Sequence, residues 1–434
     1  MHIAVWADSV TPRLQYITQH ILGEMLGFEV VLTENRDQFS SFAGAKIAYG
    51  DVEFDDAISI SPHGLLGESG ITRQAVTMGC WNSVPIFFET NPHAQIPFDL
   101  FAAAFYLISR YEEYLPFESD EHRRFPSTAS LAHRESFLEI PLVDMWVKEL
   151  ETIIKQKFPD VAIKERSFQF IPTIDIDNAY AFKHRGLLQS CLGLGKALVH
   201  FRFADFAGRL AVFLGSRPDP FDTYHRLFQI LIQCPDAVWF MLGGKRGRFD
   251  KSVPLGNQSM QALIKRIASE YRVGIHPSYA SGDVLQTVRE ELNGLSEVVG
   301  QPITASRQHY LRFRMPHTHR LLAGLGITHE YSMGYSNAIG FRASTCTPFR
   351  FYDLMDEKEL PLTIVPFQVM DRALLTMGCN AQTAAQRTLE LAQRVKRVGG
   401  TFSTLWHNES LSGINEWKGW ENVLGEIVNR VKAM

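Results

Sequence analysis

The part of the sequence after residue 166 alternates between short apolar segments and longer segments whose apolar residues recur at helical spacing. We expect strands at residues 168–175, 236–241, 272–276, 302–306, 328–332, 362–368 and 401–406. Helices are expected at residues 223–232, 260–271, 284–298, 318–325, 383–398 and 417–431. Roughly seven units of strand then helix predict an α/β fold, a (β/α) barrel with one irregular or missing unit, and a doubly wound open sheet is the alternative.

Residues 1–165 have a different pattern, and we expect them to form a smaller α/β domain of unknown role ahead of a barrel domain at 166–434. Short strands are expected at 3–6, 28–32 and 47–49, and helices at 14–26, 97–114 and 143–157. The polar turn at 159–166 separates the two patterns. We find no catalytic constellation in this half of the sequence.

Two groups of charged residues outside the strand ends have simple structural interpretations. Arg110, Glu112 and Glu113 end an apolar helical segment, and an intramolecular salt-bridge cluster is more common for such a group than a partner site. Arg342 lies in a turn at residues 340–346, and a buried salt bridge between Arg342 and Asp353 is expected around this turn.

The composition is that of an ordinary globular protein, with 45% hydrophobic and 21% charged residues. The formal net charge of -4 gives no electrostatic argument for binding nucleic acid or an anionic membrane. No window has the ~18 uninterrupted apolar residues of a transmembrane segment, and the amino terminus does not have the pattern of a signal peptide. The cysteines are odd in number and widely scattered, which favours a reduced, cytoplasmic protein. They are Cys80, Cys191, Cys234, Cys346 and Cys379.

One long insertion, residues 183–220, follows the first expected strand of the second half. It is rich in Gly, Phe, Leu and Arg. Such a segment could cover the active-site face as a lid, or it could pack on the side of the domain.

The sequence Thr-Ile-Asp-Ile-Asp places two carboxylates, Asp175 and Asp177, at the far end of that first strand. Residues two apart in a strand point to the same face, so both carboxylates would enter one site. Two like charges this close repel each other unless a cation or a shared proton lies between them. The pair is therefore a candidate for a metal and base site, although one Asp could instead cap the next helix while the other is solvated.

Other candidate residues follow the ends of three later strands. His276 and Ser281 follow the third strand, Arg307 and His309 follow the fourth, and His407 follows the last. The carboxyl ends of barrel strands meet on one face, so these residues are expected to be neighbours of the Asp pair. Taken singly, each also has a structural interpretation: a core histidine, a helix cap, an ion-pair partner or a residue just outside the site.

The four motifs at residues 173–177, 276–281, 306–310 and 405–407 together resemble those of the polysaccharide deacetylases, the NodB-homology group of carbohydrate esterase family four. The segments 97–114 and 332–342 resemble the bacterial branch that joins such a domain to an uncharacterised N-terminal domain. The resemblance implies a distorted (β/α)7 barrel. It also implies metal-assisted removal of an acetyl group from a sugar.

Residue by residue, the resemblance implies that Asp175 is the general base, that Arg307 orients it, and that His407 protonates the leaving amine. Asp177 and His276 would bind a divalent metal, with zinc the expected ion. The sequence departs from the usual family pattern at two points: one residue separates the two aspartates, and Ala280 stands where the family has its second metal-binding histidine. A catalytic zinc site generally has three protein ligands, so His309, or alternatively Ser281, would complete the set.

These residues favour a metal-dependent hydrolase that removes an acetyl group from an amino sugar or a related saccharide. The expected partner is a small-molecule or oligosaccharide substrate. A catalytically silent relative that binds saccharide or scaffolds a biosynthetic complex is the main alternative, and Ala280 favours it. A third hypothesis is hydrolysis of C–N bonds in amides that are not sugars.

Overall fold

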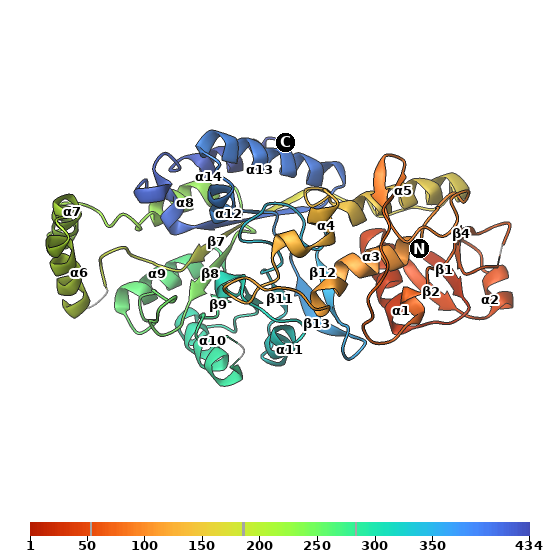
Figure 1. The fold of residues 1–434 in the computed structure, drawn as a ribbon, viewed down its shortest axis with the longest axis horizontal. Coiled ribbons are helices and arrows are strands. Elements are labelled where there is room, and N and C mark those ends of the chain that lie inside the picture. Colours follow the sequence, from red (N-terminus) through yellow and green to blue (C-terminus); the bar gives the residue numbers. More distant parts are fainter. Residues whose placement is uncertain (53, 185–186, 283) are drawn as a thin grey trace.

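The computed structural model describes residues 1–52, 54–184, 187–282 and 284–434, and its two larger sheets lie at different positions along the molecule (Figure 1). The first sheet has four parallel strands in the order β2-β1-β3-β4. They are β1 (His2–Ala7), β2 (Glu29–Thr33), β3 (Ala45–Tyr49) and β4 (Ile58–Ile60). Strand β3 is buried along its whole length, which is typical of parallel strands covered on both faces.

Helices and short turns surround this first sheet. Helix α1 (Pro12–Thr18) begins with a proline after the capping residue Thr11, whose hydroxyl accepts the backbone N–H of Leu14. It continues as a π-helix, Gln19–Met25, so the single helix expected at 14–26 is two segments. The remaining elements are α2 (Arg36–Ser40), β5 (Gly79–Trp81), β6 (Val84–Ile86), α3 (Leu100–Ile108), α4 (Leu131–Arg134) and α5 (Leu142–Lys157).

The second sheet has nine strands in the order β12-β13-β11-β10-β9-β8-β7-β15-β14. All neighbouring strands are parallel except β12 and β13, which are antiparallel. The strands are β7 (Gln169–Ile176), β8 (Val238–Leu242), β9 (Arg272–His276), β10 (Ala305–Ser306), β11 (His329–Glu330), β12 (Phe349–Asp353), β13 (Lys358–Ile364), β14 (Val369–Met370) and β15 (Thr401–His407). The predicted α/β class with a parallel sheet is thus confirmed. The strand order has two ends, and closure into a barrel stays a prediction.

Helices connect most of the parallel strands. Those after the insertion are α8 (Tyr224–Leu231), α9 (Gln258–Ala268), α10 (Leu285–Val299), α11 (His317–Gly324), α12 (Asp371–Thr376), α13 (Ala381–Arg397) and α14 (Val423–Lys432). The insertion itself contains α6 (Leu187–Val199) and α7 (Phe203–Phe213). The strand expected at 362–368 is wrong in its bounds, because Pro366 has no N–H to donate and lies between β13 and β14.

Close packing holds the strands that carry the site at fixed positions. Strands β7 and β15 are paired over seven residues, and the last of these pairs joins Asp175 to His407. In β9, a side chain at Gly274 would place its Cβ 2.5 Å from the Phe240 ring and 3.0 Å from the carbonyl oxygen of Ala305. Glycine is therefore required where β8, β9 and β10 meet.

A buried charge cluster joins the first half of the chain to the second. The helix expected at 97–114 ends early, because Arg110 has a left-handed backbone with φ of 55°. Arg110 and Arg342 both contact Glu113, at 2.8 Å and 2.6 Å. The expected pairing of Arg342 with Asp353 is wrong, since the buried Asp353 accepts from Arg320 instead. The charged cluster at 110–113 is intramolecular, as expected.

Among the residues that the structure describes, no helix is long and apolar enough to cross a membrane. Cys80, Cys234, Cys346 and Cys379 are free thiols, whereas the side chain of Cys191 lies outside the described residues.

Candidate active site

The residues predicted from the sequence meet at the carboxyl edge of the second sheet. Asp175 lies in β7 and Asp177 just after it, while His276 and His407 are the last residues of β9 and β15. His309 follows β10 by three residues. All five line one cavity of about 690 Å³. The strand order sets their arrangement: the Asp pair is central, His407 enters from one flank, and His276 and His309 enter from the other.

Asp175 is held by a buried arginine. Its Oδ1 accepts a hydrogen bond of 2.7 Å from Nη1 of Arg307, which also donates to the Thr173 hydroxyl at 2.6 Å. The Nε of Arg307 donates to the carbonyl of Tyr331, so the guanidinium is fixed on two sides. The second oxygen of Asp175, Oδ2, lies 3.7 Å from Nε2 of His276. One carboxylate oxygen is thus used for positioning, and the other faces the histidines.

Hydrogen bonds fix the tautomers of the two histidines on the β9–β10 flank. His276 donates from Nδ1 to the carbonyl of Arg307 at 2.5 Å, and His309 donates from Nδ1 to Oδ1 of Asp250 at 2.8 Å. Both rings therefore turn Nε2 toward Asp177, at 3.1 Å for His276 and 3.3 Å for His309. An imidazole whose other nitrogen donates to a carbonyl or a carboxylate is oriented as metal-binding histidines usually are.

Asp177 lies between these imidazoles, and the set fits a divalent cation. Ligand atoms of Asp177, His276 and His309 all lie within 4.8 Å of one another. Oδ1 of Asp177 is buried and has no hydrogen bond of its own, although an Nε2 lies close to it. Two acceptors at this distance need either a proton or a cation between them. One carboxylate and two imidazoles are ligands that zinc accepts, and three protein ligands leave a position for water.

The pKa values of Asp177 and His309 indicate that protons and a cation would compete for these side chains. Burial alone would raise the pKa of Asp177, but the imidazoles of His309 and His276 hold it well below its usual range. Burial alone would lower the pKa of His309, but Asp177 and Asp250 raise it to about 9. A cation that binds here must therefore displace protons, so its affinity should rise with pH.

The structure places the imidazole of His309 near Ala280, which stands where the family pattern has its second metal-binding histidine. Asp250 accepts the backbone N–H groups of Tyr279 and Ala280, at 2.7 Å and 3.1 Å, and also orients His309. Ser281 donates its hydroxyl to the carbonyl of Ser278 and is not among the described residues that line the cavity. The geometry thus favours His309 over Ser281 as the third ligand.

His407 lies across Asp177 from the other two histidines. Its Nδ1 donates to Oδ1 of Asp371 at 2.8 Å, and its Nε2 lies 3.6 Å from Oδ2 of Asp177. Burial alone would lower the pKa of His407, but the buried carboxylate of Asp371, with Asp177, raises it to about 10. His407 therefore holds a proton at neutral pH and points it into the cavity, as a general acid must.

Residues of the first half also line this cavity, namely Glu121, His122 and Arg124. Arg124 donates to the carbonyl of Tyr310 at 2.7 Å. The His122 ring packs edge-on against the ring of Tyr310, with centroids 4.8 Å apart. This part of the wall therefore combines aromatic and polar side chains.

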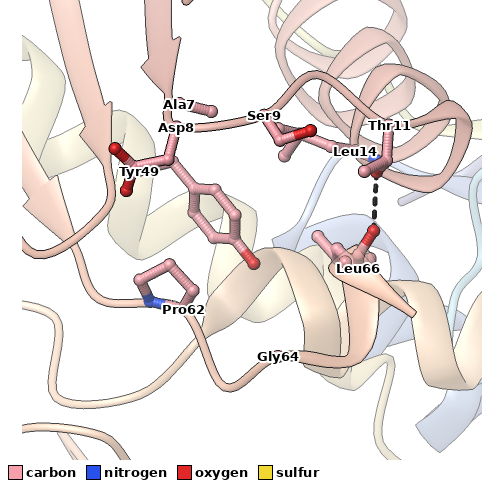
Figure 2. Close-up of a pocket in the computed structure, with 10 residues that line it drawn as sticks. Ala7, Asp8, Ser9, Thr11, Leu14, Tyr49, Pro62, Gly64 and Leu66 are labelled. Carbon is pink, nitrogen blue, oxygen red and sulfur yellow. Dashed lines mark hydrogen bonds between the residues drawn. The ribbon is translucent and has the colours of Figure 1, made fainter.

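A second, smaller cavity of about 190 Å³ lies at the carboxyl edge of the first sheet. Its polar side chains include Asp8, Ser9 and Thr11, and Figure 2 shows the hydrogen bond from Thr11 to the carbonyl of Leu66 on one side of it. Tyr49 lines the cavity as well and donates its hydroxyl to Asp99 at 2.7 Å. No histidine or cysteine is among the described residues that line it.

Comparison with known proteins adds little to this geometry. Residues 3–159 match a family described as of unknown function, DUF7033. No curated protein matches the chain.

Solved structures similar to the chain include a putative polysaccharide deacetylase from Mycobacterium smegmatis, at 16% identity and a TM-score of 0.41, covering 62% of this chain and 86% of that one. Another is a probable polysaccharide deacetylase from Pseudomonas aeruginosa PAO1, at 12% identity and a TM-score of 0.40, with the same coverage. A third is the polysaccharide deacetylase Bc1974 from Bacillus cereus, at 12% identity and a TM-score of 0.30, covering 62% and 88%.

Sequence reasoning missed the residues that support the site from behind. Asp371 begins α12, a helix that was not expected, and Asp250 lies in a loop between β8 and α9. Neither belongs to a recognisable motif, although an aspartate at the start of a helix is itself a weak signal. Glu121, His122 and Arg124 lie in the half of the chain where no site was expected.

Proposed function

We propose that this protein is a metal-dependent hydrolase that removes an acetyl group from an amino sugar or a related saccharide. One observation supports the proposal: a positioned carboxylate and an imidazole oriented by Asp371 flank three residues that could hold a metal ion, all in one cavity. A site that only binds saccharide needs neither a base nor an acid. The zinc ion expected from the sequence remains part of the proposal, with Asp177, His276 and His309 as its ligands.

Asp175 would act as the general base. A divalent cation in this position polarises a carbonyl oxygen and lowers the pKa of water beside it. Oδ2 of Asp175 faces the metal-binding atoms, and it would take the proton from the attacking water. Arg307 donates to the other oxygen and so fixes the orientation of the carboxylate. We regard Arg307 as a positioning residue, because it contacts Asp175 rather than the cavity's reacting atoms.

His407 would act as the general acid. Its neighbour Asp371 fixes the ring and stabilises the imidazolium, and the proton on Nε2 faces the cavity. When the C–N bond of the acetamide breaks, the leaving nitrogen must gain a proton. His407 would supply this proton. Because Asp175 takes one proton from water while His407 gives one away, the number of protons held by the two side chains stays the same.

The saccharide part of the proposal is supported by the motif resemblance and by the cavity. About 690 Å³ is within the range of small-molecule sites, and it leaves room for one or two sugar units. Aromatic side chains, Phe249 and Tyr310, lie beside polar ones on its wall. The scattered free thiols agree with the cytoplasmic location expected from the sequence, which we include in the proposal.

The test is acetate release from N-acetylated amino sugars by the purified full-length protein, with and without a chelator. We expect turnover that is lost with the chelator and restored by zinc or another divalent ion. A parallel series of linear and cyclic amides that are not sugars distinguishes the substrate classes. Turnover of these amides alone would mean that the substrate is an amide and not a saccharide. Saccharide binding without turnover of any acetylated substrate, in metal-loaded protein, would overturn the hydrolase and favour a silent binding protein.

A further inference from the structure

The insertion between β7 and α8 forms a helical hairpin that stands apart from the rest of the molecule. Helices α6 and α7 extend from one end of the long axis, and the first sheet lies at the opposite end (Figure 1). The two helices bury Ala197 and Val212. No described residue of α6 or α7 lines the large cavity, and the lid considered from the sequence stays a prediction.

The hairpin exposes most of the large apolar side chains that the described part of the chain leaves in solvent. Fourteen such residues are exposed in all, and eight of them lie within 192–214. Those eight are Leu192, Leu198, Val199, Phe201, Phe203, Leu210, Phe213 and Leu214. Phe201, at the tip between the helices, is 79% exposed, and its ring contacts that of Phe203. Apolar side chains gathered in this way mark an interaction surface rather than the normal scatter on a monomer.

The charges of the same segment are positive. Between residues 187 and 217 there are four cations, Lys196, Arg202, Arg209 and Arg217, and a single anion, Asp205. Lys196, Arg202 and Arg217 are exposed. This segment is therefore locally positive, although the whole chain has a net charge of -4. The net charge of the whole chain therefore does not exclude an anionic surface as a partner of this segment.

We propose that the α6–α7 hairpin binds the surface of an anionic lipid bilayer, lying in the interface with its apolar side chains inserted among the lipids. Apolar residues with aromatic rings, bordered by Lys and Arg, are the composition of interfacial helices. A second copy of the chain is a poorer occupant, because a symmetric contact would bring two cationic hairpins together. Nucleic acid is poorer too, since its interfaces are polar rather than rich in exposed Phe, Leu and Val.

Hydrogen bonds tie the base of the hairpin to the candidate active site. Asp219 accepts the backbone N–H groups of Ala181, Phe182 and Lys183, at 2.7 to 2.9 Å, and so joins the segments that enter and leave the hairpin. Asn408, directly after His407, donates to the carbonyls of Asn178 and Phe221 on the same two segments. A hairpin bound to a bilayer would therefore hold the carboxyl edge of the second sheet in a fixed relation to that surface.

Co-sedimentation of the full-length protein with lipid vesicles tests this proposal, and it requires no catalytic activity. We expect binding to vesicles of equal parts phosphatidylcholine and phosphatidylglycerol, and weaker binding to phosphatidylcholine alone. The double variant Phe201→Ser/Phe203→Ser should lower the apparent affinity about tenfold or more, because two exposed aromatic side chains are lost from the interface. The variant Lys196→Gln/Arg217→Gln should remove most of the preference for anionic vesicles and its sensitivity to salt.

A matched control is Ile232→Ser, because Ile232 is 76% exposed but lies outside the hairpin. We expect it to bind vesicles as the wild type does. Absence of binding to both kinds of vesicle would overturn the proposal, and so would an equal loss in the Ile232 variant. Self-association that the Phe201→Ser/Phe203→Ser change abolishes, without vesicle binding, would assign the surface to a second copy instead. All the substituted side chains are exposed, so circular dichroism should show an unchanged fold.

Discussion

Both parallel sheets have a cavity at the carboxyl ends of their strands, but the side chains at the two edges differ in kind. At the first sheet, two of the polar side chains bind the protein itself: Thr11 donates to the carbonyl of Leu66 (Figure 2), and Tyr49 donates to Asp99. At the second sheet, two carboxylates and three imidazoles face one another across a cavity more than three times as large, about 690 against 190 Å³.

The difference shows that strand topology supplies a position for chemistry and that side chains decide whether chemistry occurs there. At the second edge, Arg307, Asp250 and Asp371 each orient one functional group from behind. At the first edge, no comparable pair of an imidazole and a carboxylate occurs among the described cavity-lining residues. Substitutions at the two edges should therefore have very different effects.

The largest difference should come from removing the proposed base. Asp175→Asn keeps the shape and the bond to Arg307 but cannot take a proton, so kcat for acetate release should fall by about 10²–10⁴-fold. The matched change at the other edge, Asp8→Asn, should leave kcat unchanged. Steady-state kinetics on one acetylated substrate measures both. Equal losses in the two variants would remove the distinction between the edges.

The contact between the two halves of the chain should dominate stability. Burial alone would raise the pKa of Glu113, but Arg342 and Arg110 lower it from its ordinary value of 4.5 to about 2. Because the folded-state pKa is depressed, this stabilisation is present above pH 4.5 and is lost as the pH falls toward 2. Glu113→Gln should lower the free energy of unfolding by on the order of 3 kcal/mol at neutral pH. It should also make the free energy of unfolding depend less on pH below 4.5. Urea unfolding across pH tests this, with the exposed Glu118→Gln as the control.

A smaller effect is expected from the carboxylate behind His309. Asp250→Asn leaves the ligands in place but weakens the orientation of the His309 ring, and metal affinity should fall by about 10–100-fold. Competition with a chromogenic chelator measures the affinity. An unchanged affinity would show that His309 is not a ligand or that its ring needs no support.

The smallest effect concerns pH. Asp371 helps to raise the pKa of His407 to about 10, and the acid is active only while protonated. Activity should therefore be lost as the pH rises through this pKa. In Asp371→Asn the pKa falls, so the alkaline limb of kcat/KM should move to lower pH by about one unit or more. If the alkaline side of the kcat/KM profile does not move, Asp371 does not influence the general acid.

Much of the second sheet could be predicted from periodicity. Strand β9 has the predicted bounds, β15 is one residue longer at its carboxyl end, and β7 is shifted by one residue at each end. Long apolar segments bounded by polar turns carry a strong signal. Strands β10 and β11 are only two residues long, and Pro366 separates β13 from β14. Such short or interrupted strands are fixed by their neighbours in the sheet rather than by local sequence.

The candidate site could be predicted where a residue ends a strong strand, and less well elsewhere. Asp175, His276 and His407 belong to such strands. Asp371 and Asp250 act through a second residue, and His122 reaches the cavity from the other half of the chain. Long-range placement of that kind leaves no periodic trace in the sequence.

The proposed hydrolase depends on His309 as the third ligand of its metal site. Elemental analysis of the wild type, His309→Ala and Ser281→Ala tests it most directly, because these two residues are the alternative third ligands. We predict near-stoichiometric zinc or another divalent metal in the wild type and in Ser281→Ala, and a large loss in His309→Ala. Retention of the metal in His309→Ala, or no metal in the wild type after incubation with zinc, would contradict the account.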